Sequence, residues 1–206
     1  MIAYLTWLWA ERRWIGAGVL MCAFSGFGQT FFISLSNTAL REEFGLSHGD
    51  LGALYAGATA TSAMILLEFG KIVDRLSARV TAAITICGLA AACLLMASAW
   101  AVWVLFFAYL FLRLFGQGMM GHVALTLTGR WYERARGRAV SLVTMGFPFS
   151  EALLPAIAVS VILTLGFRAL WIGGAGVLLL VTLPLIYLLL SQERTPRIKP
   201  GEASES

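Results

Sequence analysis

Four polar side chains lie inside stretches that are otherwise apolar, and they are the residues best able to do chemistry. Arg113 and Gln117 fall in the run RLFGQG, while Gln29 and Glu151 fall in two other apolar stretches. A charge in an apolar environment is costly unless it faces a cavity or an opposite charge. A guanidinium in such a place can bind an anionic group, and a carboxylate can accept a proton. The sequence therefore predicts that these four residues line a substrate cavity.

Six long apolar segments position these side chains. Hydrophobic residues make up 59% of the chain and charged residues 13%, whereas a soluble domain carries roughly 25% charge. A helix needs about 20 mostly apolar residues to cross a bilayer, and the runs are too long for barrel strands of about 10 alternating residues. We therefore expect an all-α membrane protein whose helices span residues 15–40, 50–73, 80–98, 100–128, 139–164 and 169–190.

Arg113 and Glu151 are predicted to reach the same depth in the membrane. Each lies about 13 residues inside one end of its span, which at 1.5 Å per residue is roughly 20 Å. Glu151 is therefore the predicted counter-charge of Arg113; alternatively, Arg113 binds a substrate anion and Glu151 carries a proton. Glu151 and Glu68 are the proton-coupling candidates, and for Glu68 the alternative is a charge that reaches the inner interface.

The basic residues are distributed unevenly between the two sides of the membrane. Only Arg41 and Arg168 lie in outer loops, and Arg113 lies within a span. This positive-inside pattern predicts that both termini are cytoplasmic, and the net charge of +4 is then no sign of nucleic-acid binding. The inner side holds twelve of the fifteen basic residues: Arg12, Arg13, Lys71, Arg75, Arg79, Arg130, Arg134, Arg136, Arg138, Arg194, Arg197 and Lys199.

Three regions are expected along the chain. Residues 1–14 are rich in tryptophan and resemble an interfacial segment lying along the inner membrane surface. Residues 15–190 form the six-helix bundle. Residues 191–206 are polar and contain two prolines, which predicts a disordered cytoplasmic tail.

Two charged loops carry the most specific pattern. Residues 70–79, between the second and third spans, read GKIVDRLSAR, and residues 129–139, between the fourth and fifth, read GRWYERARGRA. Both resemble loops of the major facilitator superfamily of secondary transporters at the corresponding places, although Ser77 stands where the family usually has glycine. The resemblance implies half of a twelve-helix fold, built as two inverted three-helix repeats. It also implies an inner gate made by Gly70, Asp74, Arg75, Arg79 and Arg136.

The resemblance implies a secondary active transporter, or its N-terminal half, in the inner membrane. The arginine within the fourth span favours a small organic anion as substrate and protons as the coupling ion. We expect contact with membrane lipid and no cofactor, metal or nucleic acid. The alternative is a truncated or half-length protein that is inactive until it assembles with a second six-helix half or a second copy.

A membrane enzyme is disfavoured by the residues that the chain lacks. The only histidines are His48 and His122, and no GxSG or HExxH motif occurs. Asp50 and Asp74 are expected on opposite sides of the membrane, so they cannot form a catalytic pair. The glycines of residues 116–121 spell GxGxxG, but a dinucleotide site needs a preceding strand, so they are interpreted as helix-packing points.

Small and apolar residues predict which spans are buried. The second span has small residues at helical spacing, at Ala53, Gly57 and Thr61, which favours a central position in the bundle. The third and sixth spans carry almost no strongly polar residues and are expected to face lipid.

Overall fold

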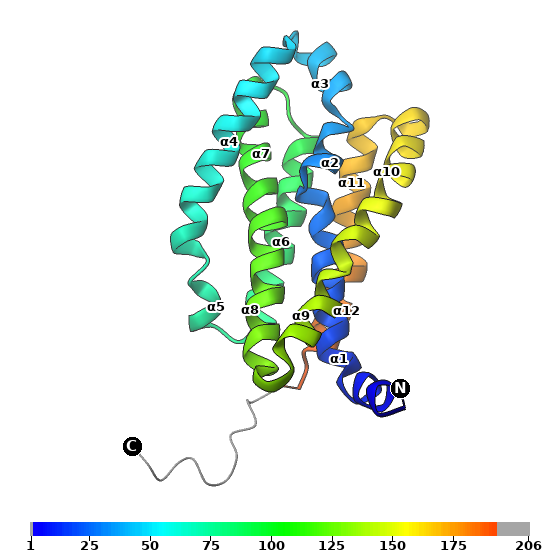
Figure 1. The fold of residues 1–206 in the computed structure, drawn as a ribbon. Coiled ribbons are helices and arrows are strands. Elements are labelled where there is room, and N and C mark those ends of the chain that lie inside the picture. Colours follow the sequence, from blue (N-terminus) through cyan, green and yellow to red (C-terminus); the bar gives the residue numbers. More distant parts are fainter. Residues whose placement is uncertain (1, 193–206) are drawn as a thin grey trace.

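The computed structural model describes residues 2–192, in which six helical spans are long and apolar enough to cross a membrane (Figure 1). These spans confirm the expected all-α membrane fold, and no strand occurs among the described residues. Their bounds are Thr6–Ser34, His48–Arg75, Ala78–Ala97, Val102–Trp131, Glu133–Leu165 and Phe167–Leu189.

Several spans are interrupted or joined by short helical pieces. The first comprises α1 (Ile2–Phe24), the 3₁₀ turn η1 (Ser25–Gly28) and α2 (Thr30–Ser34), followed by α3 (Asn37–Phe44). The second and third are α4 (His48–Phe69) with α5 (Ile72–Arg75), and α6 (Ala78–Ala97). The fourth is α7 (Val102–Phe111), the π-helix η2 (Leu112–Met120) and α8 (Gly121–Trp131). The rest are η3 (Glu133–Ala135), α9 (Arg136–Thr144), α10 (Gly146–Leu165), α11 (Phe167–Val177), η4 (Leu178–Thr182) and α12 (Leu183–Leu189).

Two expected regions remain outside what the structure tests. The described part of residues 1–14 continues into α1 without a break, and its interfacial position stays a prediction. Of the expected tail at 191–206, residues 193–206 lie outside the described residues.

Local sequence signals explain where α4 and α6 begin. Ser47 and Asp50 form a reciprocal capping box at the start of α4, with each side chain bonded to the other residue's backbone N–H. Ser77 caps α6, since its hydroxyl oxygen lies 3.4 Å from the Val80 backbone nitrogen. Ser77, which stands where the family's loop usually has glycine, therefore caps the first turn of the third span.

The order of burial differs from the sequence-based expectation. In the third span, 56% of the most apolar stretch is buried, against 17% in the second span and 11% in the fifth. The prediction that the second span is central was wrong, because its small residues Ala53 and Gly57 are exposed. The prediction of a lipid-facing third span was also wrong, since α6 packs against α7, η2 and α11. Figure 1 shows α4 and α10 along opposite edges of the bundle.

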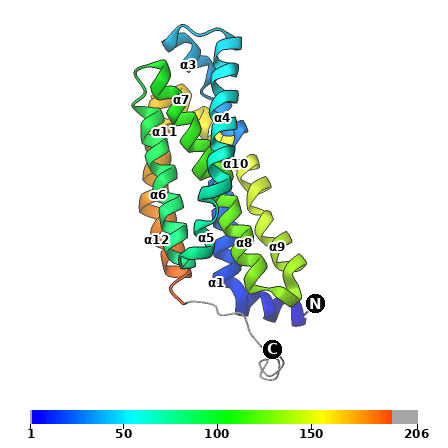
Figure 2. The ribbon, with the colours of Figure 1, turned by 90° about the vertical axis from the view of Figure 1, so that its left-hand side faces the viewer.

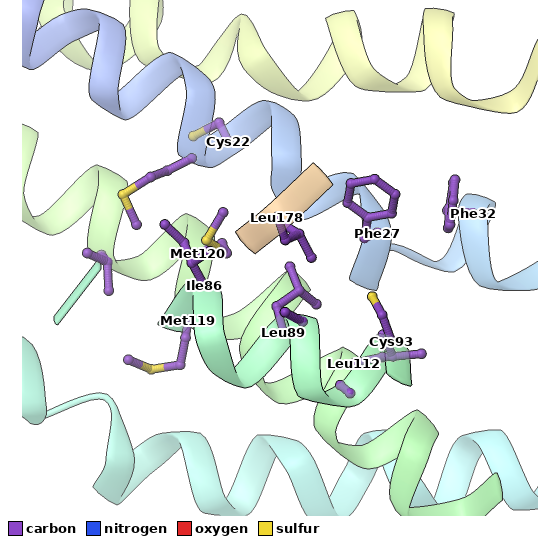
Figure 3. Close-up of a cluster of buried hydrophobic side chains, with 14 of the residues drawn as sticks. Cys22, Phe27, Phe32, Ile86, Leu89, Cys93, Leu112, Met119, Met120 and Leu178 are labelled. Atoms are coloured by element: carbon purple, nitrogen blue, oxygen red, sulfur yellow. The ribbon is translucent and has the colours of Figure 1, made fainter. Parts of the chain in front are cut away.

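The core lies where the first, third, fourth and sixth spans meet. Figure 3 shows Phe27 from the first span in one cluster with Leu89 from the third and Leu178 from the sixth. Phe32, also from the first span, meets Trp171 of α11 edge to face, with ring centroids 5.3 Å apart. Turned by 90°, the bundle shows α6 beside α11 and α12 (Figure 2).

The first and fourth spans touch backbone to backbone at two glycines. A Cβ added to Gly28 would lie 2.6 Å from the Gly116 Cα and closer still to the Leu112 carbonyl oxygen, and one added to Gly116 would lie 2.5 Å from the Gly28 Cα. Real Cβ atoms do not approach so closely, so only glycine permits this crossing. The interpretation of residues 116–121 as packing points is confirmed at Gly116.

We expect Gly28→Ala to destabilise the bundle, because its Cβ would overlap backbone atoms that no side-chain rotation can move. Overpacking a core costs about 1–3 kcal/mol even where neighbours are side chains. The melting temperature of the purified protein in detergent should fall clearly. Gly173→Ala is the matched control, since nothing lies within 4 Å of its added Cβ; a similar melting temperature for both variants would contradict the crossing.

Candidate functional site

Two irregular segments bring the polar residues of the first and fourth spans together. Gln29 is extended, with φ −80° and ψ 152°, so the helix of the first span is interrupted just before Thr30. The π-helix η2 begins at Leu112, next to Arg113. Such interruptions release backbone groups from the regular helical ladder and are frequent at functional sites. Both lie beside the contact of Gly28 with Gly116.

Arg113 joins three spans through its side chain. Its Nη1 donates to Thr30 Oγ1 over 3.1 Å. Thr30 Oγ1 also lies 2.8 Å from the Tyr55 hydroxyl, in a hydrogen bond in which either group can donate. The guanidinium carbon is 5.5 Å from the centre of the Tyr55 ring, a cation–π distance. The first, second and fourth spans therefore meet at one half-buried cation.

Three buried polar atoms on the helices that meet at this cation have no partner among the described residues. They are Arg113 Nε, Tyr109 Oη and Thr59 Oγ1. Tyr109 lies four residues before Arg113, and its ring centroid is 5.5 Å from that of Tyr55. Thr59 lies four residues after Tyr55, so facing helices each contribute an i, i+4 pair. Because buried polar groups are normally hydrogen-bonded, this cluster has donors and acceptors available for a ligand or water.

The predicted ion pair of Arg113 with Glu151 was wrong. In the part of the chain that the structure describes, Arg113 forms no ion pair, and Glu151 is exposed on α10. The residue count fixed only the depth of each side chain. Arg113 instead contacts Thr30 of α2 and Tyr55 of α4. Their separate roles in cavity and proton coupling stay predictions.

The two glutamines neighbour residues of this site in the sequence, and among the described residues neither forms a hydrogen bond with Arg113. Gln29 is half-buried at the interruption of the first span, while Gln117 is exposed. A Cβ added to Gly28 would lie 3.0 Å from the Gln117 backbone nitrogen, so the two glutamines flank one crossing. Thr30, Tyr55 and Tyr109 were not predicted from the sequence. Tyr109 lies four residues before Arg113, a helical spacing that could have identified it, whereas Thr30 and Tyr55 lie on other spans and carry no such signal.

At the end of the bundle that holds α5, an ion pair and a histidine connect α5 and the preceding Gly70 to α8. Asp74 pairs with Arg130, whose Nη1 also donates to the Val73 carbonyl over 3.2 Å. His122 Nε2 lies 3.2 Å from the buried Gly70 carbonyl oxygen. Of the predicted gate residues, Gly70 and Asp74 therefore take part in this connection. The partner of Asp74 is Arg130, which lies in the second charged loop but was not among the predicted gate residues.

The other predicted inner residues lie elsewhere. Arg79 donates from Nε to the Tyr187 carbonyl over 3.2 Å and stacks 4.0 Å from its ring centre. Arg136 lies against Gly129, and Arg75 is exposed. Glu68 pairs with Lys71 over 2.7 Å at the end of α4. Gating and proton-coupling roles for these residues remain predictions.

Comparing the sequence with models of protein families identifies the family to which the chain belongs. The model of the Major Facilitator Superfamily matches residues 18–206. The chain belongs to this superfamily. Searches of curated proteins and of solved structures found no match. As a member of the Major Facilitator Superfamily, the chain is a multi-pass membrane transport protein. Among the described residues, no group of three or more His, Cys, Asp or Glu side chains could hold a metal ion.

In this superfamily member, we expect Asp74 and Arg130 to act as a unit. Both are largely exposed, with 60% and 46% of their side-chain surface accessible, so the pair contributes about 0.2–1 kcal/mol. Asp74→Asn and Arg130→Gln should impair transport to a similar extent, and the double variant should be no worse than either single one. Uptake into cells expressing each variant at equal membrane levels measures this; additive losses would show that the two residues act separately. Arg134→Gln, in the same exposed loop, is the control.

Proposed function

We propose that the chain transports a small organic anion and that Arg113 binds its anionic group. The observation that carries this proposal is a half-buried arginine within a membrane span that has no carboxylate partner among the described residues. Its Nη1 is held by Thr30, while its Nε has no acceptor. A carboxylate would supply that acceptor and balance the charge.

Protons are the proposed coupling ions. Glu151 is the main candidate carrier, because it lies exposed on α10 and has no ion-pair partner among the described residues. A carboxylate within a membrane span is neutral when protonated and charged when not, so substrate movement can depend on its state. Glu68 is the second candidate, although its pairing with Lys71 favours a local structural role.

The proposed orientation places both termini in the cytoplasm and the chain in the inner membrane. The N-terminus lies at the same end of the bundle as α5 and as the connection between α8 and α9 (Figure 1). This end carries most of the basic residues, which supports a cytoplasmic side.

We expect Arg113→Gln to lower anion uptake strongly while the protein still inserts. Loss of one charged hydrogen bond corresponds to about a 10- to 100-fold weaker interaction. Uptake of labelled acetate, lactate and benzoate, with their neutral amides as controls, measures this effect. Arg113→Lys should retain part of the activity, because it keeps the charge but not the planar fork. Arg12→Gln, at the inner end of α1, should transport like the wild type.

Equal uptake by wild type and Arg113→Gln would contradict the role of the arginine. If the wild-type chain takes up none of these anions when present alone, the alternative is favoured, in which it works only after assembly.

The proposal extends to a second six-helix unit of the same superfamily that covers α4 and α10. These helices are the least buried, and their exposed faces include Ala56, Ala60 and Glu151. A carboxylate within a membrane span faces protein or water rather than lipid, and small residues let helices of a partner approach closely. A covering unit would therefore enclose a water-filled cavity beside Arg113.

We expect Glu151→Cys to react in membranes with a charged, water-soluble maleimide, because its position would line that cavity. The background should carry Cys87→Ser, since Cys22 and Cys93 are buried whereas Cys87 is exposed. Leu180→Cys is the matched control: Leu180 is 79% exposed on the sixth span and should face lipid. If neither cysteine reacts, α10 faces lipid and the covering unit is contradicted.

A further inference from the structure

A small cavity lies between the first and second spans and shares two lining residues, Thr30 and Tyr55, with the cluster around Arg113. Its volume is about 150 Å³. Pockets for drug-sized ligands measure about 300–1,000 Å³, so this one admits only a molecule of a few atoms or one end of a longer solute. Its polar lining comes from α2, α3 and the first two turns of α4: Thr30, Ser34, Asn37, Arg41, His48 and Tyr55.

Arg41 is the charged group of this cavity and lacks an acceptor. Its Nε is buried and unbonded among the described residues. A buried guanidinium N–H without an acceptor is costly, and an arginine presents a planar fork that matches a carboxylate. An anion in the cavity would supply the missing acceptor.

The neighbouring carboxylates are engaged elsewhere or point away. Asp50 accepts from the Ser47 backbone N–H and hydroxyl, over 3.0 and 2.6 Å. Glu43 pairs with Arg168, which also donates to the carbonyls of Ala97 and Ala99. Glu42 is exposed and follows Arg41 directly on α3, and adjacent helical residues do not share a face. The charge of Arg41 is therefore not balanced by these acids.

The cavity adjoins the partners of Arg113. Thr30 and Tyr55 line it, and the same two side chains form the hydrogen-bonded group that contacts Arg113. An anion leaving Arg41 would therefore meet Arg113 once this threonine–tyrosine pair moved aside.

We propose that this cavity is an outer anion subsite, in which Arg41 binds a small carboxylate before it reaches Arg113. The second step rests on the proposed transport function, whereas binding at Arg41 does not. Asn37 and His48 add hydrogen-bonding groups to the lining, and Ser34 lies at the same wall.

The test measures the charge preference of the cavity directly. Ser34→Cys, in a Cys87→Ser background, places a thiol in the lining. Its reaction rate is measured with a sulfonatoethyl and a trimethylammonioethyl methanethiosulfonate, which have similar sizes and opposite charges. A cleft of one charge raises the rate of an opposite ion by 10-fold or more, so the anionic reagent should react about tenfold faster. Acetate should slow it, and acetamide should not.

Three further variants decide the outcome. Arg41→Gln should bring the two rates close together, and Arg41→Lys should keep the preference for the anion. Arg113→Gln should leave the preference intact even if uptake is lost, which separates this subsite from the transport proposal. An unchanged rate ratio in Arg41→Gln would overturn the subsite, as would a thiol that reacts with neither reagent.

Discussion

The contact of Gly28 with Gly116 is the constraint on which the rest of this arrangement depends. Without side chains, the two backbones come close enough that an added Cβ on Gly28 would lie 2.6 Å from the Gly116 Cα. The first span is interrupted at Gln29 and the fourth is a π-helix from Leu112, on either side of this crossing. Thr30 can therefore accept a hydrogen bond from Arg113, and the cation is held between three spans rather than in lipid.

The charged groups toward the two ends of the bundle differ in how they are bonded. Arg41, on the outer side in the proposed orientation, and Arg113 have unbonded Nε atoms. Thr30 and Tyr55 line the cavity of Arg41 and also contact Arg113. Toward the inner side, Asp74 pairs with Arg130, and His122 lies within hydrogen-bond distance of the Gly70 carbonyl. Arg41 and Arg113 thus have no ion-pair partner among the described residues, whereas α5 and α8 are joined by the pair of Asp74 with Arg130. In the proposed orientation, this asymmetry would favour entry of an anion from outside.

The spans and the two charged loops could be predicted from the sequence, whereas the direction of the key side chains could not. Bilayer thickness sets the length of a span, so composition alone located all six. Depth along a helix follows from counting residues, but direction follows from 3.6-residue periodicity, which fails at the extended Gln29 and in the π-helix around Arg113. Glu151 was therefore assigned to Arg113 wrongly, and Thr30 and Tyr55 were missed. The small residues of α4 are exposed. A stripe of small residues indicates that a helix can pack closely, but it does not indicate which helix packs against it.

The most direct test of this account is nuclear magnetic resonance of the Arg113 side chain in protein carrying ¹⁵N-arginine. The Nε–H signal is assigned by its loss in Arg113→Lys, and acetate or acetamide is then added. Acetate should shift the signal and slow its exchange with water, because a carboxylate would fill the missing acceptor position. Acetamide should cause little change. A signal that is unaffected by acetate, benzoate and lactate would contradict the claim that the unbonded Nε–H of Arg113 can bind an organic anion.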